Sequence, residues 1–437
     1  MQGAGTGRRR LGLWGVALLV AAAACTPSDG DDDPAGPEPT PEATEEPTEE
    51  PDEEEAEATE ALATIARQVS TLRGLELEEE IPTELVSPDE LAEVVTERDR
   101  DAEAIERLAA SGRVLAALRH VPADVDLEAV VDDLQAASIV GLYDPEATVA
   151  YISTEEVPLG PSASTTAAHE LIHALQDQHF DLSRLDDIPP EEGDAALAFL
   201  SVVEGDAVLL EEEWAATHQT DEERQAADRE QVAGAGEQLA ALEDVPSYVV
   251  ETFVFPYVAG ERFVAALIEE GGYEAVDAAL EEPPMTTLEV LSPEAYLDGF
   301  EPAHVEPGVA PAEDFEEIMT SSFGAFDLLA LFGAADSTEA QAGAAAWPAW
   351  RGGALAAWER GDDLVVAGAW RFEGAERASD ACAALPAWYG DVADGQEVGD
   401  DVLEGDRDAL VLDCDGSDVR FALSPDATLA EAALKPE

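Results

Sequence analysis

Two histidines and a glutamate in the spacing HExxH are the residues of this sequence whose types and positions could do chemistry. They are His169, Glu170 and His173. On an α-helix, residues four apart point in similar directions, so both imidazoles can face one ion. Zinc accepts two imidazoles in this way, and a glutamate beside the first can take a proton from a water on the metal. The motif therefore predicts one catalytic Zn²⁺ ion, with His169 and His173 as ligands and Glu170 as general base.

The surroundings of the motif strengthen this prediction. The chain has only six histidines, and three of them, His169, His173 and His179, lie within one short stretch. The neighbouring residues are uncharged in an otherwise acidic protein, which predicts a buried helix. Burying two imidazoles and a carboxylate without a partner is costly, so a bound cation is the expected partner.

A catalytic zinc needs a third protein ligand, and two residues compete for this role. Glu204 lies in the apolar stretch 198–210, where a buried carboxylate demands a positive partner. His179 stands at the third-ligand position of the metzincin pattern HExxHxxGxxH, but Gln176 replaces the glycine that ends the helix there. If the helix continues, His179 points away from the other two imidazoles. The sequence favours Glu204, with a metzincin-like site using His179 as the alternative.

These residues resemble those of the gluzincin class of metallopeptidases. The stretch 169–174 with Asp177 is similar to the thermolysin-type helix, and 204–207 looks like the glutamate helix. The segments 141–145 and 173–180 also resemble a group of poorly characterised bacterial envelope proteins, and the likeness covers about residues 60–335. It implies a zincin-like fold, peptide-bond hydrolysis and a peptide or protein substrate.

The resemblance also implies supporting residues. A tyrosine or histidine usually holds the oxyanion in such enzymes, for which Tyr257 is the first candidate and His304 the second. Asp177 and Asp206 are candidates for bracing the imidazoles. The strand expected near 148–152 would align an extended substrate by backbone pairing. A different class of function remains open, namely a non-catalytic envelope binding or assembly protein with a structural zinc, although such a protein has no need of Glu170.

The hydrophobic pattern predicts an α+β fold with two folded parts. Residues 59–340 should form a mainly helical, zincin-like metallopeptidase domain with a short sheet, and 341–437 a small α+β module. In the first part we expect a helical opening section over 60–137, then a hairpin of 139–142 with 148–152. Helices should follow over about 162–178 (capped by Ser162 or Ser164), 194–216, 253–270 and 273–280.

The C-terminal module should contain strands and one helix. The strands are expected at 355–359, 364–372, 409–414 and 419–423, and the helix over 375–385 should stop before Pro386. A disulfide between Cys382 and Cys414 would join this helix to the sheet. His120 and His218 are expected at the surface.

The N-terminus has the pattern of an export signal. Three arginines precede an uncharged stretch from Leu11 to Ala24, and small residues directly before Cys25 resemble a bacterial lipoprotein cleavage site. Residues 1–25 are therefore predicted to be a lipoprotein signal peptide with Cys25 lipidated; a plain signal peptide is the alternative. Residues 26–58 read as an acidic, proline-rich disordered linker. The protein is thus expected in the cell envelope, tethered by its lipid to the outer face of the cytoplasmic membrane.

The charge of the chain narrows the choice of partners. It carries 99 acidic and 21 basic residues, a formal net charge of -78. Such a surface repels phosphate backbones, so nucleic acid is excluded as a partner class.

Overall fold

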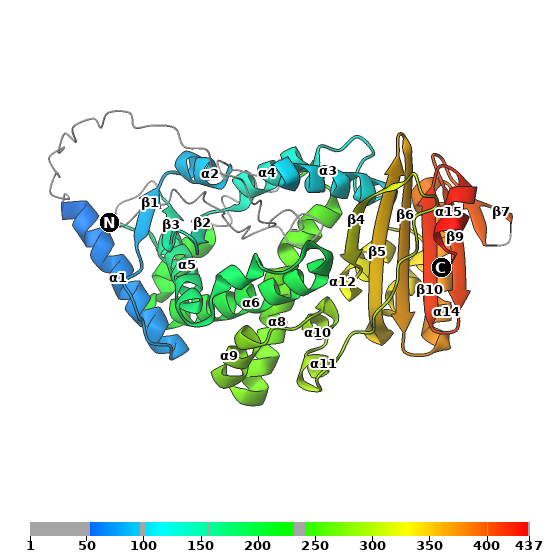
Figure 1. The fold of residues 1–437 in the computed structure, drawn as a ribbon. Helices are drawn as coiled ribbons and strands as arrows, with labels where there is room; N and C mark the ends of the chain where they lie inside the picture. The colour runs from blue at the N-terminus through cyan, green and yellow to red at the C-terminus, as the bar shows by residue number, and fades with distance from the viewer. Residues whose placement is uncertain (1–52, 97–101, 155–157, 231–241, 400, 436–437) are drawn as a thin grey trace, which may run out of the picture.

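The structure, a computed structural model, describes residues 53–96, 102–154, 158–230, 242–399 and 401–435. The predicted signal peptide, the lipidation site at Cys25 and most of the predicted linker lie outside these residues. The described chain forms a mainly helical part and a part built on a large sheet, at opposite ends of the molecule (Figure 1). The predicted α+β class is confirmed.

The first part consists of helices beside a small sheet. The helices are α1 (Glu53–Arg73), α2 (Pro88–Thr96), α3 (Ala102–Ala117), α4 (Leu127–Ser138), α5 (Pro161–Phe180), α6 (Gly193–His218), α8 (Ser247–Gly271), α9 (Tyr273–Glu281), α10 (Thr287–Leu291) and α11 (Pro293–Leu297). The sheet has the order β1-β3-β2, with strands β1 (Thr83–Val86), β2 (Gly141–Asp144) and β3 (Val149–Ser153). Among the described residues, no helix has the length and apolar character needed to cross a membrane.

The small sheet corrects two expectations. The opening section over 60–137 was expected to be helical throughout, yet it contains β1, which pairs in parallel with β3. Because β2 pairs antiparallel with the other side of β3, the predicted substrate-aligning strand is the central strand and both of its edges are occupied. A strand pairs through its edges, so among the described strands of this sheet only β1 and β2 have an edge left for a further strand.

Helix α1 begins within the segment expected to be a linker. It starts at Glu53, and residues 53–58 are therefore helical. Ala58, Leu62, Ile65 and Val69 follow at helical spacing and are buried, and the last three lie in one core with residues of α5 and α6. An apolar face of this kind supplies the stabilisation that the acidic composition alone lacks.

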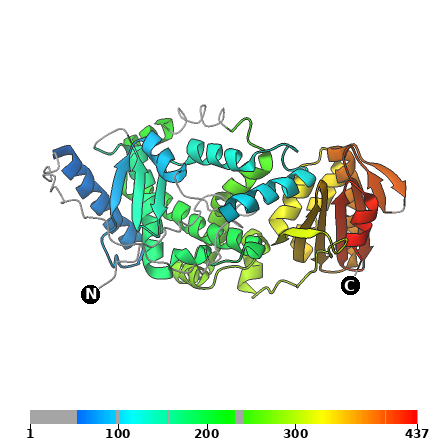
Figure 2. The same cartoon turned by 45° about the horizontal axis from the view of Figure 1, so that its top comes forward.

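The second part is built on a seven-stranded sheet with the order β4-β5-β6-β10-β9-β8-β7. Figure 2 shows this part, coloured yellow to red, at the end of the molecule away from the blue helix α1. Its elements are β4 (Glu316–Ser322), α12 (Ala325–Gly333), α13 (Thr338–Ala344), β5 (Trp350–Arg360), β6 (Asp363–Phe372), α14 (Ala375–Ala393), β7 (Gln396–Gly399), β8 (Val402–Glu404), β9 (Ala409–Asp415), β10 (Asp418–Ser424) and α15 (Ala427–Ala433). The sheet therefore begins upstream of residue 341, where the sequence placed the start of the module, because β4 pairs with β5.

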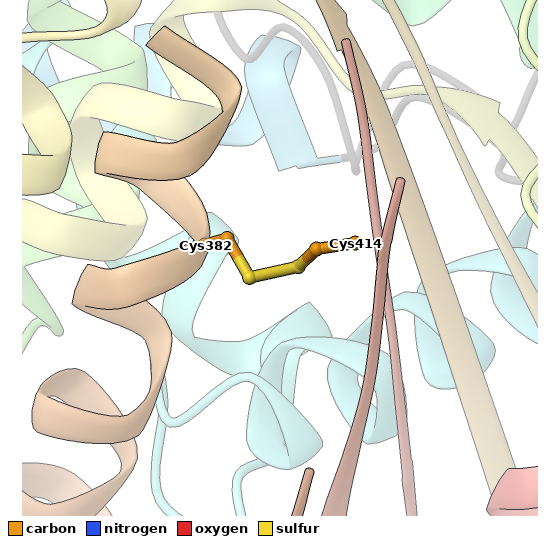
Figure 3. Close-up of a disulfide and its surroundings, with 2 residues drawn as sticks. All are labelled: Cys382 and Cys414. Atoms are coloured by element: carbon orange, nitrogen blue, oxygen red, sulfur yellow. A yellow bond between two sulfur atoms is a disulfide. The ribbon is translucent and has the colours of Figure 1, made fainter. Parts of the chain in front are cut away.

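Helix α14 continues through Pro386 instead of stopping before it. A proline removes one backbone hydrogen bond, but Leu385, Trp388 and Tyr389 on both sides of it are fully buried, and this packing holds the helix together. The disulfide between Cys382 of α14 and Cys414 of β9 is present and joins the helix to the sheet (Figure 3).

A pair of buried carboxyl groups lies where α6 meets α12. Asp194 accepts a hydrogen bond from the Thr287 hydroxyl at 2.6 Å, and its other oxygen has no hydrogen-bond partner among the described residues. Burial and the charge of Asp327 raise the pKa of Asp194 to about 7. Burial also raises the pKa of Asp327 to about 6, although the Tyr248 hydroxyl donates to it at 3.0 Å.

The residue His120, expected at the surface, lies beside this pair. It is 7% exposed and stacks on the ring of Tyr248 at 4.2 Å between centroids. Burial lowers the pKa of His120 to about 3, so the imidazole is neutral near pH 7 and does not offset the two carboxyl groups. The turn after α3 carries it inward, which helical periodicity alone does not reveal.

Replacing Asp194 by Asn is expected to change how stability depends on pH. The ordinary pKa of 3.8 rises to about 7 in the fold, so the native state keeps a proton that the unfolded chain releases. This stabilisation is present at about pH 4 and is lost as the pH rises through about 7. Asn removes the buried charge and keeps an oxygen for Thr287, so above pH 7 the variant should be more stable than wild type by about 1–4 kcal/mol.

Urea unfolding between pH 5 and pH 8 checks this prediction, with the exposed Asp187→Asn as the matched control. Wild type and the control should lose stability relative to Asp194→Asn as the pH rises. Parallel pH curves for all three proteins would contradict the prediction.

Candidate metal centre

Helix α5 carries the HExxH motif. It begins after an extended Gly160, with Pro161 at its first position, where a proline presets the helical φ angle. The expected cap at Ser162 or Ser164 is wrong, because Ser164 already lies inside the helix and its hydroxyl donates to the Gly160 carbonyl at 2.9 Å. The apolar face of α5 packs on α1 and α6 and consists of Ala167, Ala168, Leu171, Ile172 and Leu175.

A glycine contact between α6 and α8 positions Glu204. A Cβ atom on Gly205 would lie 2.3 Å from the backbone of Gly260, and one on Gly260 would lie 2.0 Å from the carbonyl oxygen of Ser201. The two helices therefore touch through their backbones at this point. Glu204 precedes the contact on α6 and Tyr257 lies one turn before it on α8, so the crossing brings these two side chains to the same region.

The structure brings His169, His173 and Glu204 together as a group that could bind a metal ion. The Nε2 atoms of the two imidazoles lie 3.1 Å apart. Oε2 of Glu204 lies 3.4 Å from Nε2 of His169 and 3.5 Å from Nε2 of His173. This oxygen is buried and has no hydrogen-bond partner among the described residues, and a cation between the three atoms would satisfy it.

The electrostatics of the group favour an added positive charge. Burial opposes a proton on His169, yet the carboxylates of Glu204 and Glu211 outweigh this effect and raise the pKa of His169 well above its usual value. Burial likewise opposes ionisation of Glu204, but the imidazoles outweigh it and lower the pKa of Glu204 to about 2. A site that stabilises an ionised carboxylate and a protonated imidazole stabilises a metal cation for the same reason.

Two side chains fix the orientation of the imidazoles. Oε2 of Glu211 lies 2.8 Å from Nδ1 of His169, and Oε1 of Gln176 lies 3.0 Å from Nδ1 of His173. Each oxygen is an acceptor, so each imidazole carries its proton on Nδ1. Nε2 of each imidazole is then the nitrogen that would bind a metal ion, after His169 has given up the second proton that its raised pKa retains without the ion.

The expected braces Asp177 and Asp206 do not contact the imidazoles. Asp177 accepts hydrogen bonds from the Tyr143 hydroxyl and from the Leu182 backbone, both at 2.8 Å. Asp206 is paired with Arg73 at 3.0 Å and with the Gln176 amide at 2.9 Å. The sequence placed both carboxylates near the motif, but their directions depend on tertiary contacts with α1 and β2.

The alternative ligand His179 is not part of the group. Helix α5 runs without a break to Phe180, so His179 points away from His173, and its Nε2 lies 2.8 Å from the carbonyl oxygen of Glu76. The residue that stands in place of the helix-ending glycine, Gln176, instead braces His173.

Glu170 lies in the pocket beside the group and is 7% exposed. Burial raises the pKa of the Glu170 carboxyl, although the neighbouring imidazoles act in the opposite direction. Strand β2 covers it closely, because a Cβ atom on Gly141 would lie 2.7 Å from Oε1 of Glu170. The glycine at this position therefore gives the carboxylate its space.

Tyr257 lines the same pocket from α8, together with Phe253, with Leu142 of β2 and with Ile139 shortly before β2. Its ring stacks with that of His169 at 6.4 Å between centroids. Burial and the charges of Glu204 and Glu170 raise the pKa of Tyr257 well above its usual value. The hydroxyl therefore keeps its proton and can donate a hydrogen bond.

The remaining histidines lie elsewhere. The side chain of His304 is 85% exposed and pairs with Glu306 at 2.7 Å, and the neighbouring Ala303 is bonded to Arg351 of β5. The structure therefore does not bring the second oxyanion candidate to the pocket. His218 is exposed at the end of α6, as expected.

Reasoning from the sequence missed Glu211, Gln176 and Gly141. Glu211 lies two helical turns after Glu204 and Gln176 one turn after His173, so helical spacing could have placed both on the metal-facing side. No local signal marks Gly141, because its close neighbour Glu170 belongs to another element. Comparison of the chain with protein-family models, with curated proteins and with solved structures found no match.

Proposed function

We propose that this protein is a zinc-dependent metallopeptidase of the gluzincin type. The observation that carries the proposal is the convergence of the two imidazole Nε2 atoms and one carboxylate oxygen that has no hydrogen-bond partner among the described residues, in a buried pocket with Glu170 beside them. Two histidines and one glutamate are a ligand set of catalytic zinc sites, whereas structural zinc sites are usually closed by cysteines.

The spacing of the three ligand atoms is compatible with a tetrahedral zinc ion. Atoms 2.0–2.1 Å from a tetrahedral zinc lie about 3.3–3.4 Å from one another. The three separations here are 3.1, 3.4 and 3.5 Å. The side chains of His169, His173 and Glu204 are thus already arranged as such an ion needs them, and little rearrangement would accompany binding.

Glu170 is the general base in this proposal. A bound zinc ion would supply Lewis acidity, which polarises a peptide carbonyl and acidifies water. The Glu170 carboxylate takes the proton of the attacking water and then passes it to the leaving amine. Burial raises the pKa of Glu170, which makes it a better proton acceptor than an exposed glutamate.

Tyr257 would stabilise the developing oxyanion. Its hydroxyl keeps a proton because burial and nearby carboxylates raise its pKa, and its side chain lines the same pocket as Glu170. A donor held in place before the reaction costs no reorganisation in the transition state. Residues of β2 also line the pocket, and β2 is an outer strand of its sheet, so an extended peptide could pair with its backbone.

The proposal includes a cellular setting, which rests on the N-terminal sequence. The enzyme is exported and held on the outer face of the cytoplasmic membrane by a lipid on Cys25, with an acidic spacer before α1. Its substrates are peptides or proteins of the cell envelope or its surroundings. The net charge of -78 excludes nucleic acid as a partner.

Cleavage of a peptide library with and without a metal chelator tests the function. The purified protein should cleave peptides, lose at least about 90% of its activity when its metal is removed, and regain it with one equivalent of zinc, because the chemistry depends on the ion. A zinc-loaded protein that cleaves no peptide would instead point to the non-catalytic binding or assembly protein.

A further inference from the structure

A chain of buried polar contacts connects the N-terminal helix to one of the two imidazoles. Arg73, the last residue of α1, has a side chain with 0% exposure, and its Nε lies 3.0 Å from Asp206 of α6. Asp206 accepts from the amide of Gln176 at 2.9 Å, and Gln176 contacts His173. Four side chains from three helices are thus joined in one line from α1 to the metal group.

The direction of each hydrogen bond in this chain is determined. The amide nitrogen of Gln176 donates to the carbonyl oxygen of Val203 and to Asp206, and both partners can only accept. The amide oxygen must therefore face His173, whose Nδ1 has to donate. This leaves the lone pair of His173 on Nε2, next to Glu204.

The position of Asp206 depends in turn on Arg73. Asp206 has an exposure of 0%, and an isolated carboxylate in such a place is strongly disfavoured. The guanidinium of Arg73 lies against both Asp206 and Asp277 of α9, at 3.0 and 2.6 Å, and over the ring of Tyr273 at 4.5 Å. These contacts hold the guanidinium in place, so the carboxylate that aligns Gln176 is fixed by α1.

The two imidazoles are braced in different ways. His169 has a direct carboxylate partner, Glu211, whose side chain is 29% exposed. His173 instead contacts the neutral amide of Gln176. The nearest carboxylate on this side, Asp206, contacts Gln176 and is neutralised by Arg73. We infer that Arg73, Asp206 and Gln176 act together as positioning residues that set the tautomer and direction of His173, so that α1 is part of the metal centre. This inference rests on the proposed zinc site.

A double-mutant cycle on zinc affinity tests the inference. Competition with a chromophoric chelator would measure the zinc dissociation constant of the full-length apo protein and its variants. Gln176→Met removes the brace on His173 and should weaken zinc binding by about 10- to 100-fold. Arg73→Lys keeps the charge but not the planar guanidinium, and should weaken it several-fold. In the Gln176→Met background, Arg73→Lys should have little further effect, because the connection is already broken.

Asp177→Asn is the matched control. Asp177 lies on α5 and accepts two partly buried hydrogen bonds, one from the Tyr143 hydroxyl and one from the Leu182 backbone N–H. Neither oxygen of Asp177 is hydrogen-bonded to His169 or His173 in these contacts. Its replacement should lower the melting temperature of the apo protein and leave zinc affinity within about 2-fold, since outer contacts matter to the metal only when they touch its ligands.

The outcomes separate this inference from the proposed function. Tight zinc binding by wild type, with Arg73→Lys unchanged or with the two substitutions acting independently, would overturn the connection and leave the function standing. Absence of zinc binding by folded wild type would overturn both. If Arg73→Lys lowered the folding stability but bound zinc as tightly as the control Asp177→Asn, the connection between Arg73 and His173 would also be overturned.

Discussion

Glu170→Gln is expected to lower kcat/KM for peptide hydrolysis by about 10²–10⁴-fold, the usual contribution of a general base. Gln has nearly the same shape but cannot accept the proton of the attacking water. The substitution leaves His169, His173 and Glu204 in place, so zinc should remain bound. Loss of turnover with full metal content is the expected signature.

The matched control for this prediction is Glu212→Gln. Glu212 lies on α6 and is exposed, and it does not line the pocket. The same change of atoms there should leave kcat/KM within about 2-fold, as is usual for an exposed surface residue. Cleavage rates and zinc content measured on both variants provide the check, and equal activity of Glu170→Gln and wild type would rule out Glu170 as the base.

Glu204→Gln is expected to weaken zinc binding by more than about 100-fold, beyond the usual cost of losing an outer-shell partner. The substitution removes the anionic ligand and leaves two neutral imidazoles. Glu204→Asp keeps the charge but shortens the side chain, so it should bind zinc better than Glu204→Gln and more weakly than wild type. Competition with a chromophoric chelator measures the zinc dissociation constants of wild type, Glu204→Gln and Glu204→Asp.

The order of affinities distinguishes a ligand from a general electrostatic effect. If Glu204 acted only through its charge, Glu204→Asp would match wild type. If another residue were the third ligand, both substitutions would leave the affinity close to that of Glu212→Gln. Either result would contradict the assignment of Glu204.

The elements that position the motif were largely predictable from the sequence. Helices α5, α6 and α9 and strands β3, β9 and β10 follow the expected ranges closely, because each has a clear apolar period of its own. Strand β2 lies two residues later than expected, since Tyr143 and Asp144, which were assigned to the turn, pair with β3. Glu204 could be singled out for a similar reason, since a carboxylate inside a long apolar helix conflicts with burial unless a cation is present.

What the sequence did not reveal depends on contacts between distant segments. Strand β1 is a strand because it pairs with β3, and α14 passes Pro386 because the sheet buries its other residues. The braces on the imidazoles depend on how α5 crosses α6. The nearest carboxylates, Asp177 and Asp206, turned toward Tyr143 and Arg73 instead, and neither partner is close to them in the sequence.

The start of α1 shows that composition alone does not locate the boundary between a disordered linker and a helix. Its first turns are rich in glutamate and have no basic residue, which is typical of a disordered segment. The apolar positions that fix the helix, such as Leu62 and Ile65, pack against α5 and α6. Composition alone therefore placed the end of the linker a few residues too late.

A crystal structure of the zinc-loaded protein, with anomalous diffraction measured on both sides of the zinc edge, tests the proposed metal site most directly. One anomalous peak is expected about 2.0–2.2 Å from Nε2 of His169, Nε2 of His173 and a carboxylate oxygen of Glu204. A peak elsewhere in the molecule, or one on the two histidines with Glu204 turned away, would contradict the proposed site.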